Sequence, residues 1–190
     1  MLRFFGLYII YLVRKLKDCK SVLYNGFTII YAFRGSKIVL GKNIIINSST
    51  LSNLIGIYQR TILIARHGGK ITIGDGCGIS GSTIYSISEI EIGKNVIIGA
   101  NCKIIDNNFH PLMGQKRHIQ NNRIIQKLED VDRKPIFIGD DCFIGSDAIL
   151  LKGTRLGNNC VVGAGSVVSG EYPENSIIAG NPARLIKENV

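Results

Sequence analysis

Aliphatic residues recur at every sixth position along the C-terminal half of the chain. The series runs through Ile138, Ile144, Leu150, Leu156, Val162 and Val168, and a glycine follows at Gly139, Gly145, Gly157 and Gly163. A less regular series precedes it at Ile73, Ile79, Tyr85, Ile92, Ile98 and Ile104. A fixed internal period indicates stacked supersecondary units. Six residues per side, with an aliphatic side chain inward and a glycine at the corner, predict triangular coils that pair as parallel strands.

Two stretches depart from the period. Residues 50–70 interrupt it, and residues 105–135 abandon it for a polar segment that ends at Pro135. A long excursion inside an otherwise strict repeat is usually functional or mobile. We therefore divide the chain into an N-terminal helical or apolar cap at 1–37 and a coil domain at 38–190, with the excursion at 105–135. The tail after Ser169 is expected to cap the last coil.

The N-terminal segment is apolar and then basic. Its apolar run from Phe4 to Val13 is too short to span a bilayer and has no signal-peptide cleavage motif. Arg14, Lys15, Lys17 and Lys20 follow directly. We expect a short helix here, with two alternative placements. It lies on a membrane surface with its lysines at the headgroups, or it packs against the coils or a second subunit.

The composition predicts an anionic binding partner, and the positions of the cysteines predict free thiols. Hydrophobic residues make up 45% of the 190 residues, charged residues 19%, and the net charge is +9. This charge favours a phosphate-bearing ligand, an acidic glycan or an anionic membrane face, whereas scattered cations without a basic-aromatic motif argue against nucleic acid. Four of the five cysteines share one phase of the repeat, normally occupied by small residues: Cys77, Cys102, Cys142 and Cys160. We predict that these four are buried free thiols.

The repeat motif resembles that of the hexapeptide-repeat acyltransferases. The resemblance rests on [LIV]-G-x-x-[small]-x between about 73 and 168, on DNNFHP at 106–111, on VGAGSVV at 162–168 and on AGNPARLIK at 179–187. Within that family the chain is most similar to the maltose and galactoside acetyltransferases and the polysaccharide O-acetyltransferases. The resemblance implies an all-β fold, a left-handed parallel β-helix solenoid with an extruded loop. The left hand follows from the resemblance alone.

The resemblance also implies the chemistry. Family members transfer an acetyl group from acetyl-CoA to a hydroxyl or amine, as homotrimers with each active site between two subunits. His110 matches the catalytic histidine, and histidine suits this task because its pKa lies near the working pH. Asp106, four residues earlier, is expected to orient His110, or else to close the loop as an Asx turn.

Ligand positions follow by the same resemblance. Those for acetyl-CoA are Ser146, Ala164, Ser169, Arg184 and Lys187. Gly170 stands where galactoside-type relatives carry a lysine, so one phosphate contact is either absent or supplied by Lys152 or Arg155. In the acceptor pocket the asparagine of those relatives is missing, and Ser80 or Ser82 is expected to replace it.

The preferred function is therefore acetyl-CoA-dependent O-acetylation of a sugar hydroxyl, in surface polysaccharide biosynthesis. The alternative is N-acetylation of a nucleotide-linked amino sugar. A carbonic-anhydrase-like zinc site would require all three histidines, His67, His110 and His118, around one point, which their spacing does not favour. A purely structural solenoid would need neither His110 nor the basic tail. We expect no metal and no nucleic-acid partner, and a cytoplasmic location, with peripheral contact at the inner membrane if the N-terminus binds lipid.

Overall fold

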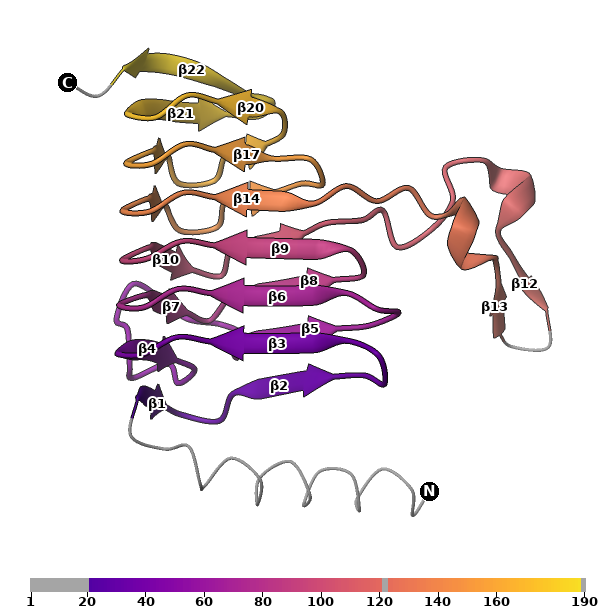
Figure 1. The fold of residues 1–190 in the computed structure, drawn as a ribbon, viewed down its shortest axis with the longest axis horizontal. Coiled ribbons are helices and arrows are strands. Elements are labelled where there is room, and N and C mark those ends of the chain that lie inside the picture. Colours follow the sequence, from indigo (N-terminus) through magenta and orange to yellow (C-terminus); the bar gives the residue numbers. More distant parts are fainter. Residues whose placement is uncertain (1–20, 121–122, 189–190) are drawn as a thin grey trace.

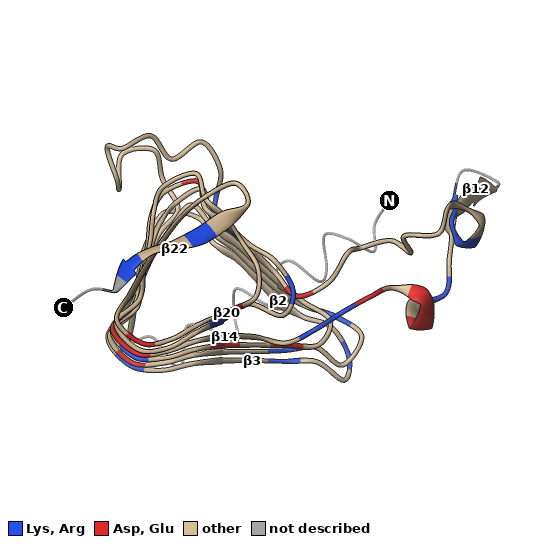
Figure 2. Cartoon of the chain, turned by 90° about the horizontal axis from the view of Figure 1, so that it is seen from above, with Lys and Arg blue, Asp and Glu red and all other residues tan. Residues whose placement is uncertain are grey.

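Residues 21–120 and 123–188 of the chain are described by a computed structural model. Their strands form a three-sided stack of coils, a parallel β-helix, in which every third strand of the stack joins the same sheet (Figure 1). Seen along the stack, the cross-section is triangular (Figure 2). The predicted all-β fold of parallel coils is confirmed.

Three sheets form the sides, and we call them A, B and C. Sheet A consists of β1 (Val22–Asn25), β4 (Ile44–Asn47), β7 (Gly78–Ser80), β10 (Ile97–Ala100), β15 (Phe143–Ile144), β18 (Val161–Val162), β21 (Ser176–Gly180) and the antiparallel β22 (Ala183–Glu188). Sheet B consists of β2 (Ile29–Ala32), β5 (Ile62–Ala65), β8 (Thr83–Ser86), β11 (Lys103–Ile105), β16 (Ile149–Leu150) and β19 (Val167–Val168). Sheet C consists of β3 (Lys37–Leu40), β6 (Lys70–Ile73), β9 (Glu89–Ile92), β14 (Ile136–Ile138), β17 (Arg155–Leu156) and β20 (Glu171–Tyr172).

The coils begin before the predicted boundary at residue 38. β1 pairs with β4 and β2 pairs with β5, so the apolar residues after position 21 already belong to the stack. The predicted N-terminal helix falls within residues 1–20, outside the described part of the chain. Among the described residues, no helix is long and apolar enough to cross a membrane.

The six-residue ladder is the core of the stack. Ile138, Ile144, Leu150, Leu156, Val162 and Val168 are all at most 4% exposed. The glycines that follow them are needed because successive coils approach closely at the corners. A Cβ on Gly145 would lie 2.5 Å from the backbone nitrogen of Ala164 in the next coil, a distance that real Cβ atoms do not tolerate.

One position of the earlier ladder was wrong. Ile84, not Tyr85, points inward: Ile84 is fully buried and pairs with Leu63 and Ile104 in sheet B. Side chains of a strand alternate between its two faces, so the one-residue shift turns Tyr85 outward. The inward residues Ile79, Ile84 and Ile92 depart from the six-residue spacing on both sides of this strand, and the tyrosine ring faces the outer surface.

The extruded loop contains its own small elements. It comprises the 3₁₀ turns η1 (Gly114–Lys116) and η2 (Leu128–Asp130) and an antiparallel pair, β12 (His118–Gln120) and β13 (Arg123–Ile125), and it projects from the stack (Figure 1). The pair was not predicted, because its short, exposed strands carry no alternation of apolar and polar residues.

Cys77, Cys102, Cys142 and Cys160 are buried and free, which confirms the prediction from their phase. Burial raises the pKa of the Cys77 and Cys102 thiols, and it raises the pKa of Cys142 to about 12. Burial in a low-dielectric core disfavours the thiolate, which is the reactive form. Cys19 lies outside the described residues.

We expect these thiols to resist alkylation in the folded protein. At pH 9 roughly one Cys142 thiol in a thousand would be ionised, given the raised pKa. In a Cys19→Ser variant, mass spectrometry after iodoacetamide should find no adduct on the native protein and four after denaturation. Rapid labelling of Cys142 in the native protein would contradict the burial of this coil.

Candidate active site

The extruded loop leaves the stack at the corner between sheets B and C and encloses a cavity at its root. The cavity has a volume of roughly 370 Å³ and is bordered by the loop, by the turn at 66–67, two coils below the loop, and by the outer face of β8. Its lining residues are Arg66, His67, Tyr85, Ile87, Asn107, Phe109, His110, Ile124, Gln126, Leu128 and Val131. An apolar cavity with a few convergent polar groups is the usual form of a small-molecule site.

The backbone before His110 is fixed by local hydrogen bonds. Phe109 has a positive φ of 57°, and its N–H donates to Asn107 Oδ1 at 2.8 Å. His110 N–H in turn donates to the Asn108 carbonyl at 2.6 Å. The Phe109 ring packs against Tyr85, with ring centroids 4.7 Å apart. This Asx-type turn holds the imidazole at the rim of the cavity, where its side chain is exposed.

Gln126 determines which nitrogen of His110 carries the proton. The Gln126 amide Nε2 donates to the Phe109 carbonyl at 2.7 Å, so its Oε1 faces His110 Nδ1, also at 2.7 Å. An amide oxygen only accepts hydrogen bonds, so Nδ1 must be the protonated nitrogen. In the neutral ring the lone pair is then on Nε2, which has no partner among the described residues and is free to accept a proton.

Sequence reasoning missed Gln126. It follows an exposed strand in the polar loop, separated from His110 by 16 positions along the chain. Only the return of the loop through η2 brings the two together, and no local spacing indicates that contact.

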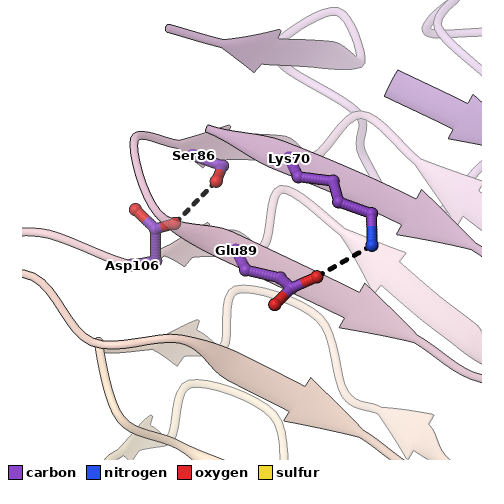
Figure 3. Close-up of polar contacts among 4 residues, drawn as sticks. All are labelled: Lys70, Ser86, Glu89 and Asp106. Carbon is purple, nitrogen blue, oxygen red and sulfur yellow. Dashed lines mark hydrogen bonds and ion pairs between the residues drawn. The ribbon is translucent and has the colours of Figure 1, made fainter. Parts of the chain in front are cut away.

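The expected orienting role of Asp106 is wrong, and the Asx turn of the loop uses Asn107 instead. Its carboxylate is fully buried and accepts from Ser86 Oγ at 2.6 Å (Figure 3). It also accepts from Ser88 N at 2.9 Å and Ile87 N at 3.0 Å. Asn107 Nδ2 also donates to it, at 3.0 Å. It makes no bond to His110 in the described part of the chain. The carboxylate instead satisfies the turn of the preceding coil, because the chain enters the loop directly above that turn.

The expected acceptor contacts of Ser80 and Ser82 do not occur at this cavity in a single chain. Ser82 is fully buried, and its hydroxyl donates to the carbonyls of Ser80 and Gly99. Ser80 is 6% exposed and accepts from the Asn47 and Asn53 amides. Both lie at the corner between sheets A and B. Their hydroxyls are used to close that corner, so Ser82 cannot contact a substrate.

The positions assigned to acetyl-CoA lie at more than one corner. Ser146 and Ala164 are adjacent on successive coils at the A–B corner, where Gly165 N–H donates to the Ser146 carbonyl at 2.8 Å. Arg184 is near them, because it pairs with Ala179, which contacts Gly163. Ser169 lies at the B–C corner, and Lys187 pairs with Ile177 at the far end of β21.

A second, basic cavity of roughly 450 Å³ lies at the B–C corner above the loop. It is lined by Lys134, Pro135, Phe137, Lys152, Gly153, Arg155, Gly170 and Glu171. Lys152 forms an ion pair with Asp132 at 2.9 Å, and this hydrogen bond is the main cause of the lowered pKa of that carboxyl. The Arg155 guanidinium stacks over the Phe137 ring at 4.1 Å. Lys152 and Arg155, the expected substitutes for a missing phosphate contact, therefore line one cavity beside Ser169.

Two of the three histidines, His67 and His110, line the cavity at the loop root, whereas His118 lies on β12. Within residues 21–120 and 123–188, no three His, Cys, Asp or Glu side chains gather into a metal-binding group.

Comparison with known proteins agrees with this architecture. Residues 135–169 match the family described as the hexapeptide repeat of succinyl-transferase. The chain is 35% identical over 105 residues to a putative lipopolysaccharide biosynthesis O-acetyl transferase of Escherichia coli K12, covering 55% of this chain and 53% of the relative. The chain thus spans about half the length of that curated relative.

Solved structures extend the similarity over most of the chain. A maltose O-acetyltransferase from Clostridium difficile 630 is 26% identical with a TM-score of 0.52, covering 85% of this chain and 70% of that one. An N-acyltransferase from Bacillus cereus, in complex with dTDP-4-amino-4,6-dideoxyglucose and coenzyme A, shares the fold at 23% identity and a TM-score of 0.55, covering 93% and 88%. These similarities confirm the resemblance to the hexapeptide-repeat acetyltransferases.

Proposed function

We propose that this hexapeptide-repeat chain is an acetyl-CoA-dependent O-acetyltransferase acting on a sugar hydroxyl, in surface polysaccharide biosynthesis. The observation that carries the proposal is the tautomer of His110, whose free Nε2 borders a cavity lined by two aromatic rings. O-acetyl transferases among the similar proteins support the reaction type. The same similarity supports the left hand of the solenoid.

In the proposed mechanism, His110 Nε2 accepts the proton of the acceptor hydroxyl as the oxygen attacks the thioester carbonyl. The Gln126 oxygen stabilises the imidazolium that forms, because it still accepts from Nδ1. His110 then returns the proton to the departing thiolate sulfur. General base catalysis of this kind typically contributes about 10²–10⁴ in rate.

The catalytic histidine and the positions assigned to acetyl-CoA lie at different corners of one chain. His110 is at the B–C corner, whereas Ser146 and Ala164 are at the A–B corner. A site that uses both sets therefore needs a second chain, whose A–B corner meets the loop of the first. This separation supports an active site between subunits of a homotrimer.

Sheet A offers the apolar surface that such an assembly needs. Leu23, Ile45, Ile97 and Phe143 are 45–56% exposed on its outer face. The strand register places them in one column, with Gly78 between Ile45 and Ile97. In contrast, charged residues gather along the side formed by β3, β14 and β20 (Figure 2). Contiguous exposed apolar surface of this kind marks protein interfaces.

We expect Ile97→Lys to convert a trimer into monomers, because it buries an unpaired charge in the apolar column. Sedimentation velocity would measure the change, and circular dichroism would check that the coils stay folded. Glu91→Lys, on the exposed face of sheet C, is the matched control and should remain trimeric. An Ile97→Lys protein that still sediments as a trimer would exclude sheet A from the interface.

The alternative, N-acetylation of a nucleotide-linked amino sugar, is distinguished by the acceptor. Acetyl-CoA consumption, followed as thiol release, would be measured with sugars, polysaccharide fragments and amino-sugar nucleotides. Base-labile ester products support O-acetylation, whereas alkali-stable amide products support the alternative. Absence of transfer to every acceptor would reject both.

The location is proposed from the sequence alone. We propose a cytoplasmic protein in which residues 1–20 either contact the inner membrane or pack within the assembly. Vesicle flotation of the full chain and of a chain lacking residues 1–20 separates these alternatives, since only membrane contact makes the two differ.

A further inference from the structure

We infer that the cavity beside His110 takes an acidic sugar, with the carboxylate or phosphate of the acceptor bound by Arg66. The inference rests on the proposed function and specifies its substrate class. Arg66 lines the cavity together with His110, Tyr85 and Phe109, and none of the lining residues is acidic. An anion entering this cavity therefore meets one permanent cation and no opposing charge.

Arg66 is held in place by its backbone and by its ring contact. Its N–H donates to the Ser86 carbonyl at 2.9 Å, and its own carbonyl accepts from Gly69 N–H at 2.8 Å. The guanidinium stacks on the Phe33 ring, 4.6 Å from the ring centroid. Stacking restrains the guanidinium plane, and a guanidinium fixed in this way suits planar oxyanions.

No carboxylate of the described chain neutralises Arg66. Its Nε is buried without a hydrogen-bond partner. Four carboxylates of this part of the stack and loop have other partners: Asp106 has four donors, Glu89 has Lys70, Asp130 has Lys116 and Asp132 has Lys152. Because Arg66 lines the cavity and forms no ion pair among the described residues, an oxyanion of the ligand would supply its counter-charge.

The rest of the cavity suits a sugar ring. Tyr85 and Phe109 form an aromatic wall next to His110, and ring faces of this kind pack against the apolar face of a pyranose. An acceptor that places its ring on this wall presents a hydroxyl to His110 and its acidic group to Arg66. The carboxylate of a uronic acid and the phosphate of a sugar phosphate share the required chemistry.

The test compares matched acceptors on Arg66→Gln and wild type. Galactose, galacturonic acid and galactose 1-phosphate are assayed at saturating acetyl-CoA. For wild type we expect kcat/KM for at least one acidic acceptor to exceed that for galactose by about 10–100-fold, the range for hydrogen bonds to charged groups. In Arg66→Gln the ratio of kcat/KM for the acidic acceptor to kcat/KM for galactose should fall to about one, through a raised KM for the acidic acceptor. The acidic acceptor that is preferred shows whether the group bound by Arg66 is a carboxylate or a phosphate.

Arg60→Gln is the matched control. Arg60 also stacks on a ring, that of Phe27 at 5.0 Å, but it does not line the cavity. The control should keep the wild-type preference. Equal use of neutral and acidic acceptors by wild type, or equal losses on all three in Arg66→Gln, would overturn the inference. So would an effect confined to the KM for acetyl-CoA, which would assign Arg66 to the phosphates of the donor.

A binding experiment distinguishes failure of this inference from failure of the proposed function. If no acceptor is acetylated, titration calorimetry with galacturonic acid and galactose 1-phosphate still tests the cavity. Binding to wild type that Arg66→Gln abolishes supports the anion site without the transferase activity. Absence of binding overturns the inference as well.

Discussion

Replacement of His110 by alanine is expected to lower kcat/KM for acetyl transfer by about 10²–10⁴-fold, the usual contribution of a general base. The melting temperature should change by no more than about 2 °C, because the side chain is exposed and its one side-chain hydrogen bond is to Gln126. Thiol release from acetyl-CoA measures kcat/KM, and differential scanning calorimetry measures the melting temperature.

His118→Ala is the control for this prediction. His118 lies on the exposed strand β12, outside the cavity, and its removal should leave the rate unchanged. Gln126→Leu gives a second arm, since it removes the acceptor at Nδ1 and should reduce kcat by less than the loss of the imidazole itself. An His110→Ala enzyme that keeps more than about a tenth of the wild-type rate would show that another group takes the proton.

Asp106→Ala should be the most destabilising single change in the loop region, by about 2–5 kcal/mol. The carboxylate is fully buried, and its removal leaves the Ile87 and Ser88 N–H groups and the Ser86 hydroxyl without their acceptor. Each unsatisfied buried group costs about 1–3 kcal/mol, partly relieved by relaxation or entering water. Urea unfolding of wild type and variant at one protein concentration measures the difference.

Asp132→Ala is the matched control, an aspartate of the same loop paired with Lys152 near the surface. Exposed ion pairs contribute about 0–1 kcal/mol, so the control should unfold near wild type. The comparison also separates the two roles of Asp106. An orienting residue would change the pH profile of transfer at nearly wild-type stability, and that result would restore Asp106 as the partner of His110.

The repeat predicts the scaffold because its physics is local and periodic. An inward aliphatic residue on each side and a close approach at the corners recur along the stack, so Ile98 and Gly99 have the same packing as Ile144 and Gly145. The four buried cysteines follow from the same phase. Where the period slips, the sequence was ambiguous by one residue, and Tyr85 was assigned to the wrong face.

The triangular coils, the free thiols and the position of His110 at the root of an extruded loop all follow from the amino-acid pattern. The partners of that histidine depend on how the loop packs against the coils. The loop returns Gln126 to His110 Nδ1, Asp106 at its start accepts from the turn of the coil below, and the turn one coil further down supplies Arg66. These contacts join residues on different coils and on both ends of the loop, whose separation along the chain follows no period. Closure of the loop on the stack therefore determines the chemistry of the cavity.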